Sequence, residues 1–251
     1  MQMAIDAHLL SRASSSETVC FRVYQMSPPA VTIGRHQRWR RVIDEEVCRA
    51  CGWDWTRRPT GGGALLHKDE INYALVAPRG LLAPQGRGEF RAGFDCIGRA
   101  LAGTLHDMGF DPQLHLGDRS ENLPQHGLCG RSITGSEIAL GDRKIIAAAQ
   151  MITPAGILQH GAIYLKTPDV SDRFWPQTDG GRDASEFTQR WTDLGPAFRD
   201  RPWPEVAAQF EDGFRRHLPV ESVPADLSAE DWDAVEAIAR RWTESGWNHA
   251  R

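Results

Sequence analysis

The sequence lacks the features that mark a membrane protein, a disulfide-rich secreted protein or a general nucleic-acid binder. No apolar run among its 251 residues is long enough to span a bilayer, and no charged-then-apolar signal peptide opens the chain. Its five cysteines are an odd, scattered set that does not resemble a disulfide framework. The net charge of −4 gives no reason to expect bulk binding to nucleic acid. We therefore expect a cytoplasmic protein that binds neither nucleic acid nor membrane.

Motifs for nucleotide and metal binding are also missing. Neither a GxGxxG fingerprint after a strand nor a P-loop signature occurs, and the chain has no internal repeats. Cys48 and Cys51 have the spacing of a redox or zinc pair, but no second such pair exists. We interpret them as two cysteines at the end of a helix, and we expect no metal site.

The composition is ordinary for a globular protein, with 41% hydrophobic and 25% charged residues. Helical and strand patterns are mixed along the chain, and a Gly-Asp turn predicts a hairpin, which favours an α+β fold with a mixed, largely antiparallel sheet flanked by helices. We predict one domain over residues 1–251, with C-terminal helices in 203–251 and no separate accessory domain. Helices are expected at 2–13, 42–51, 89–109, 203–218 and 228–245, strands at 19–24, 30–34, 53–57, 71–77, 137–140, 144–151 and 157–165, and long loops at 117–135 and 176–202.

The most informative segment runs from Arg57 to His67 and reads Arg-Arg-Pro-Thr-Gly-Gly-Gly-Ala-Leu-Leu-His. Three consecutive glycines let the backbone approach a ligand and free backbone N–H groups to bind it. The two arginines add positive charge that suits phosphate or carboxylate. This pattern indicates an anionic ligand held against a glycine loop, and the alternative is a glycine-rich turn beside solvated arginines. A second basic run, residues 35–41, is either a solvated face or a guide for an acidic partner.

Three separated segments follow one another along the chain: Ile33-Gly34-Arg35-His36-Gln37, then the Arg57–His67 motif with Asn72-Tyr73, then Gly141-x-Arg143-Lys144-Ile145 followed by Leu158-Gln159-His160-Gly161. In this order and spacing they resemble the catalytic domain shared by lipoate–protein ligases and octanoyltransferases, within the wider biotin/lipoate protein ligase family. The lipoyl branch matches the glycine segment better than the biotin branch does. Trp247-Asn248 and Arg251 also look like the end of that domain.

The resemblance implies an enzyme that acylates a lysine on a lipoyl-domain protein, of the 2-oxoacid dehydrogenase E2 or glycine cleavage H type. It implies that Lys144 is catalytic, because a lysine facing the acyl carbonyl can stabilise oxyanion charge or the phosphate of an acyl-adenylate. An apolar slot beside the glycines would suit an eight-carbon chain, at ~0.8 kcal/mol per buried methylene. The implied substrate-binding residues are Arg58, Gly61, Gly62, Gly63, His67, Asn72 and His160.

Two chemical routes to the activated acyl group stay open. In a transferase, octanoate comes from acyl carrier protein through a thioester on Cys129, which lies fifteen residues before Lys144 in a Gly-flanked loop and would gain from nearby cations. In a ligase, ATP and Mg²⁺ convert free lipoate to lipoyl-AMP, and the Thr-Gly-Gly-Gly-Ala loop favours this route. We prefer the transferase by a small margin, and expect no permanently bound cofactor.

Two departures from the family pattern bear on the donor. Ala147-Ala148-Ala149 stands where the family usually shows Gly-Ser-Ala, and Lys68 stands where aspartate usually follows the histidine. The alanine triplet also motivates a third hypothesis, an inactive binder of lipoyl domains. The sequence assigns no role to His36.

Overall fold

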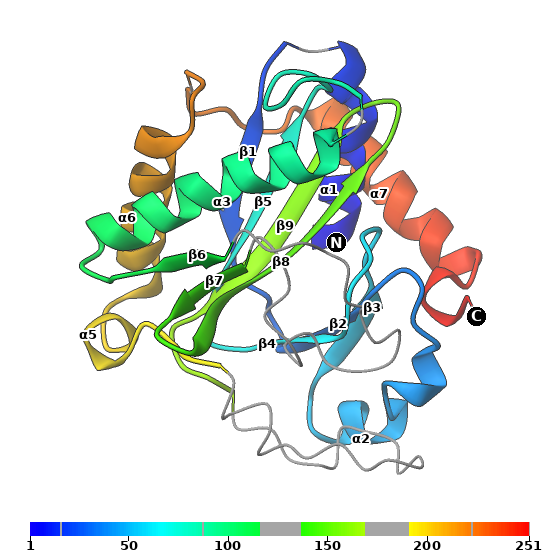
Figure 1. The fold of residues 1–251 in the computed structure, drawn as a ribbon. Helices are drawn as coiled ribbons and strands as arrows, with labels where there is room; N and C mark the ends of the chain where they lie inside the picture. The colour runs from blue at the N-terminus through cyan, green and yellow to red at the C-terminus, as the bar shows by residue number, and fades with distance from the viewer. Residues whose placement is uncertain (16, 87, 116–136, 169–190, 222, 251) are drawn as a thin grey trace.

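The computed structural model describes residues 1–15, 17–86, 88–115, 137–168, 191–221 and 223–250. A six-stranded sheet forms the centre of this part, and a three-stranded sheet lies below it in the view of Figure 1. The large sheet has the order β1 (Cys20–Tyr24), β5 (Glu70–Ala77), β9 (Ile157–Tyr164), β8 (Arg143–Ile152), β7 (Glu137–Leu140), β6 (Gln113–His115). The small sheet has the order β3 (Asp54–Arg57), β2 (Ala30–Ile33), β4 (Leu65–His67).

The predicted α+β class with a largely antiparallel sheet is confirmed. All neighbours in the large sheet pair antiparallel, and among the named strands only β2 and β3 pair in parallel. Every residue of β5 is buried, as expected for a strand covered on both faces. The predicted hairpin at Gly141 forms between β7 and β8, where Gly141 has φ +62°.

Helices cover both faces of the large sheet. On one face α3 (Glu89–Asp107) crosses in front of the strands and packs against α6 (Trp203–His217), as Figure 1 shows. Side chains of both helices pack into the largest core cluster, which includes Ile97 and Leu101 of α3 and Phe210 of α6. On the other face α1 (Gln2–Arg12) packs against β5 and against α7 (Ala229–Glu244). The short helices are α2 (Glu45–Ala50), α5 (Pro196–Arg199) and the 3₁₀ turns Ala13–Ser15, Trp39–Arg41 and Trp247–His249.

The two terminal helices are joined by a buried carboxylate. Ser228 caps α7 in a capping box with Asp231, as the Ser-x-x-Asp spacing predicts. Asp231 also lies 2.8 Å from Nε2 of His8 and pairs with Arg12, both on α1. The His8 contact is the main reason that the pKa of Asp231 lies below its ordinary value. This link packs α7 against the N-terminal helix, near the pocket described below.

Sequence patterns missed two strands. β4 and β6 have three residues each, too few to show an alternating pattern. Residues 116–136 and 169–190 lie outside the described part, and with them the predicted loop 117–135 and the first part of the predicted loop 176–202. The described end of the second loop, residues 191–202, contains the short helix α5. Cys48 and Cys51 do lie at the end of α2, the first buried and the second exposed. No helix in the described ranges is both long and apolar enough to cross a bilayer.

Candidate active site

A pocket lies between the two sheets, against the N-terminal helix. The pocket is partly open, and about 360 Å³ of it is not filled by protein atoms, a figure that includes solvent space at its mouth. Four of the predicted substrate-binding residues line it: Arg58, His67, Asn72 and His160. The other lining residues are Met3, Tyr24, Thr32, Leu65, Ala147, Ala148, Ala149 and Gly161.

Strand register brings one wall of the pocket together. Asn72 on β5 lies opposite Tyr24 on β1 and Ala162 on β9, and Ala162 lies opposite Ala147 on β8. His160 lies opposite Ala149 in the same way. Because alternate residues of a strand share a face, these residues point together toward the small sheet. All three alanines line the pocket. Ala147 is the one that adds a methyl group to its wall, because the family pattern has glycine there and already has alanine at the position of Ala149.

The arginine pair is buried, and this corrects the expectation that both side chains present charge to a ligand. Arg57 is 1% exposed and donates from Nη1 to the carbonyl oxygens of Gly34, Arg35 and Gln37. Its Nε and Nη2 donate to the carbonyl oxygens of Trp247 and Asn248. Arg57 therefore holds backbone segments together, and the alternative of solvated arginines is equally wrong.

Arg58 connects the pocket to the glycine loop. Its Nη2 donates to the carbonyl oxygens of Gly61 and Gly63 at 2.8 and 2.6 Å. Its Nη1 donates to the carbonyl oxygen and the hydroxyl of Thr32. One guanidinium thus holds the loop to strand β2. The three glycines are not lining residues of the pocket but border it through Arg58.

Two glycines meet where the end of β2 contacts the glycine loop. Gly62 has φ +91°, a conformation that favours glycine. A Cβ on Gly34 would lie 2.0 Å from the carbonyl oxygen of Gly62. The close backbone contact therefore requires glycine at position 34, while the backbone conformation favours glycine at position 62.

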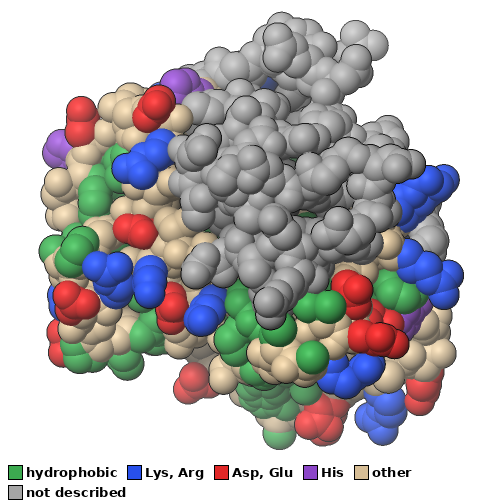
Figure 2. Space-filling model, turned by 90° about the horizontal axis from the view of Figure 1, so that it is seen from below, with side chains coloured by type: hydrophobic (Ala, Val, Ile, Leu, Met, Phe, Trp, Pro, Cys, Tyr) green, Lys and Arg blue, Asp and Glu red, His purple; other side chains and the backbone are tan. Residues whose placement is uncertain are grey.

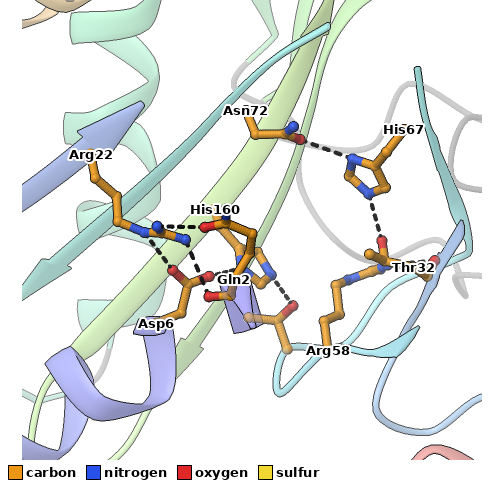
Figure 3. Close-up of polar contacts among 9 residues, drawn as sticks. Gln2, Asp6, Arg22, Thr32, Arg58, His67, Asn72 and His160 are labelled. Carbon is orange, nitrogen blue, oxygen red and sulfur yellow. Dashed lines mark hydrogen bonds and ion pairs between the residues drawn. The ribbon is translucent and has the colours of Figure 1, made fainter. Parts of the chain in front are cut away.

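His67 and Asn72 form a polar chain with two residues that sequence reasoning did not single out. Nε2 of His67 lies 2.8 Å from the Thr32 hydroxyl, and its Nδ1 lies 2.9 Å from Oδ1 of Asn72 (Figure 3). The Asn72 amide donates to Oε1 of Glu70, which is fully buried. The other Glu70 oxygen, Oε2, has no hydrogen-bond partner among the described residues. The chain sets the orientation of the His67 ring at the pocket wall.

His160 belongs to a second polar chain, which reaches the N-terminal helix. Nδ1 of His160 lies 2.9 Å from Oδ2 of Asp6, and Nε2 lies 2.6 Å from the Thr60 hydroxyl (Figure 3). Asp6 is fully buried and also accepts from Nε of Arg22. Burial lowers the pKa of His160, although the Asp6 contact opposes this. A neutral His160 therefore donates a hydrogen bond from Nδ1–H to the Asp6 carboxylate and accepts one at Nε2 from the Thr60 hydroxyl.

Lys144 is buried at the start of β8. It is 2% exposed, and its Nζ lies 5.4 Å from the centre of the Trp191 ring. Ile145 and Ile146 both belong to the large core, and a register shift in the β7–β8 pairing lies beside them. Such a bulge changes which face of the strand each side chain points to. Lys144 therefore contacts Trp191, which belongs to the same core cluster as Ala147. Lys144 lies outside the lining of the pocket.

The remaining predicted residues are distributed as follows. Cys129 lies outside the described residues. His36 and Lys68 are exposed. The described ranges hold no group of three or more His, Cys, Asp and Glu side chains that could bind a metal ion. Asp6, Thr32 and Glu70 carried no motif signal, because each takes its role from partners distant in sequence.

The mixed sheet, the glycine loop and the pocket beside the N-terminal helix define an α+β domain of the lipoate–protein ligase type. The chain belongs to the lipoyl protein ligase A/B catalytic domain family, whose model matches residues 1–212. The prediction of a protein lipoylation enzyme is thereby confirmed at the level of the family.

Curated relatives extend over nearly the whole chain. It is 26% identical over 259 residues to octanoyltransferase LipM of Kyrpidia tusciae, covering 99% of this chain and 94% of that protein. It is 29% identical over 257 residues to octanoyltransferase LipM of Symbiobacterium thermophilum, covering 98% and 92%.

Solved structures share the fold. A putative lipoate protein ligase from T. acidophilum with bound lipoic acid superposes with a TM-score of 0.78 at 19% identity, covering 99% of this chain and 92% of that one. A lipoate-protein ligase A bound with ATP gives the same TM-score at 20% identity, covering 98% and 92%.

Proposed function

We propose that the protein is an octanoyltransferase that takes octanoate from acyl carrier protein and delivers it to a lysine of a lipoyl-domain protein. The observation that carries the proposal is the end-to-end similarity to proteins named octanoyltransferase LipM. The acceptors are lipoyl domains of the 2-oxoacid dehydrogenase E2 or glycine cleavage H type. A protein of the same fold, a bi-partite lipoate protein ligase described together with its E2 lipoyl domain from Thermoplasma acidophilum, supports that acceptor class.

The proposed reaction has two steps. The Cys129 thiolate attacks the carbonyl carbon of the octanoyl thioester, the carbon–sulfur bond to the carrier breaks, and the carrier sulfur leaves as a thiolate that takes a proton from solvent. The neutral amine of the acceptor lysine then attacks the enzyme thioester. An amide forms as the carbon–sulfur bond to Cys129 breaks, the amine proton passes to solvent, and Cys129 is released as the thiolate. Deprotonating a free lysine at pH 7 costs about 4.6 kcal/mol, so an activated acyl donor is required.

Lys144 is assigned to stabilising the negative charge that develops on the acyl oxygen during both steps. Its ammonium is held within the fold, and a preorganised cation in a dry site stabilises an oxyanion better than one in water. A cation near Cys129 would also favour the thiolate. The pocket lined by Ala147 and Leu65 is assigned to the octanoyl chain. Arg58, His67, Asn72 and His160 are assigned to substrate binding around it.

The alternative is an ATP-dependent lipoate–protein ligase acting through lipoyl-AMP. The fold shared with an ATP-bound ligase supports it, while the methyl group of Ala147, where the family usually has glycine, takes up pocket space that an adenylate would need. Mg²⁺ would then come with the nucleotide.

The test supplies the purified protein and a lipoyl domain with either octanoyl–acyl carrier protein or octanoate plus ATP and Mg²⁺. The proposal predicts an octanoyl amide on the acceptor with the carrier donor and no ATP. Modification only with ATP would establish the ligase. Complex formation with the lipoyl domain but no modification from either donor would establish the inactive binder.

A further inference from the structure

An exposed arginine cluster follows directly from strand β2. Arg35, Arg38 and Arg40 are exposed, and so is His36. We call residues 35–40 the arginine ledge. The whole chain carries a net charge of −4, and on the face drawn in Figure 2 basic and acidic side chains are interspersed. A local cluster of positive charge such as the ledge is therefore a feature that an anionic partner would recognise.

Hydrogen bonds from a buried arginine fix the backbone of the ledge. Arg57 donates to the carbonyl oxygens of Arg35 and Gln37 in the ledge and of Gly34 just before it. The side chain of Gln37 accepts from the backbone N–H of Gly34, and the backbone N–H of Gln37 donates to the Gly34 carbonyl oxygen. Because these contacts already order the backbone of the turn, ligand binding there costs little backbone entropy.

The ledge lies beside the glycine loop. The backbone N–H of Arg35 donates to the carbonyl oxygen of Thr60 at 2.8 Å. Gly34, immediately before the ledge, contacts Gly62. The backbone at the start of the ledge therefore adjoins the loop that borders the pocket, and the Arg35 guanidinium lies 5.8 Å from the centre of the Trp247 ring.

No carboxylate within the described ranges forms an ion pair with Arg35, Arg38 or Arg40. Asp44 accepts from the first N–H groups of α2, and Glu45 accepts from Trp55 and contacts His249. Arg40 lies 4.8 Å from the Trp39 ring centre, which shields one face of its guanidinium and leaves its edge for hydrogen bonds.

We propose that the arginine ledge binds the phosphate of the acyl donor's phosphopantetheine-type arm, and so guides the thioester to the pocket. The proposal rests on the proposed octanoyltransferase function. Three arginines and no lysine make up its cations, and a guanidinium suits phosphate because it can donate two parallel hydrogen bonds. The acceptor lysine brings no such phosphate, so the ledge acts in the first half-reaction.

The test replaces the three ledge arginines together, Arg35→Gln, Arg38→Gln and Arg40→Gln. The matched control is Arg199→Gln, Arg215→Gln and Arg240→Gln, which removes the same charge from exposed positions away from the ledge. Three donors are compared: octanoyl–acyl carrier protein, octanoyl-4′-phosphopantetheine and octanoyl-pantetheine, which lacks the phosphate. Formation of acyl-enzyme is followed by intact mass.

The expected result is a rise in KM of about tenfold for both phosphorylated donors in the ledge variant, with kcat/KM for octanoyl-pantetheine unchanged. The control variant should match the wild type with all three donors. Equal loss with and without the phosphate would overturn the proposal, and so would a loss with the carrier protein alone or a loss confined to transfer onto the lipoyl domain. If no donor acylates the wild-type enzyme, the proposed function fails instead, which is a distinct result.

Discussion

The hydroxyl of Thr60 and Nε2 of His160 lie 2.6 Å apart although 100 residues separate them in the chain. This contact joins the residue before the three glycines to a strand of the large sheet. Through Asp6, the same histidine is tied to the N-terminal helix. The conformation of the glycine loop therefore depends on parts of the chain that lie far from it in sequence.

Replacing Thr60 by valine tests that contact. Valine keeps the volume but leaves the buried Nε2 of His160 without its partner, so the free energy of unfolding should fall by about 1–3 kcal/mol. Acyl transfer should fall with it, since the loop loses an anchor. Thr60→Ser retains the hydroxyl and serves as the control. It should keep roughly half or more of the wild-type transfer activity. Denaturant unfolding and a transfer assay measure the two effects, and equal behaviour of the two variants would contradict the account.

His160 should make stability depend on pH in one direction. Its native pKa lies below the unfolded value of about 6.5, mainly because it is buried. As the pH falls below about 6.5, the unfolded chain binds a proton that the native imidazole does not, so the free energy of unfolding decreases. Above that pH the group adds no slope. His160→Gln should flatten the curve between about pH 5 and 7, measured by urea unfolding. An unchanged slope would show that His160 titrates normally in the folded protein.

Gly34 and Gly61 form a matched pair for the backbone contact. Gly34→Ala places a methyl carbon against the carbonyl oxygen of Gly62, and overpacking of this kind costs about 1–3 kcal/mol or more. Gly61→Ala meets nothing within 4 Å and should be tolerated. Thermal unfolding compares the two variants. Similar melting temperatures would mean that the β2 end and the glycine loop are not packed as described.

Lys144→Ala should abolish acyl transfer, because the buried cation assigned to stabilising the oxyanion is lost. A fall of about 10²-fold or more is the usual scale for removing one group that stabilises an oxyanion. Arg143→Ala removes the exposed neighbouring cation on the same strand and should leave transfer nearly unchanged. A transfer assay with both folded variants checks the pair. Retained activity in Lys144→Ala would remove the lysine from the mechanism.

Sequence patterns captured most elements of the fold because hydrophobic periodicity and caps are local signals. The Ser228–Asp231 capping box and the hairpin at Gly141 are examples. The site was captured in part, since Arg58, His67, Asn72 and His160 do share one pocket. That grouping came from resemblance to a family, as no local pattern relates β4 to β9.

The sequence did not show which charged side chains stabilise the fold by contacts with distant residues. Adjacent arginines suggested a ligand, yet Arg57 is used for backbone carbonyls of the 34–37 segment and of Trp247 and Asn248. Asp6 sits in an amphipathic helix like any surface acid, and its burial against His160 and Arg22 follows only from tertiary packing. Such roles depend on long-range partners, which periodicity does not report.

The central claim is that octanoate passes through a thioester on Cys129, and intact mass of the protein tests it most directly. The protein is mixed with octanoyl–acyl carrier protein in the absence of ATP and of any acceptor, beside Cys129→Ser as the control. The account predicts an added octanoyl group on the wild type that hydroxylamine removes, and none on the variant. Absence of the adduct, or an adduct that persists in Cys129→Ser, would contradict it.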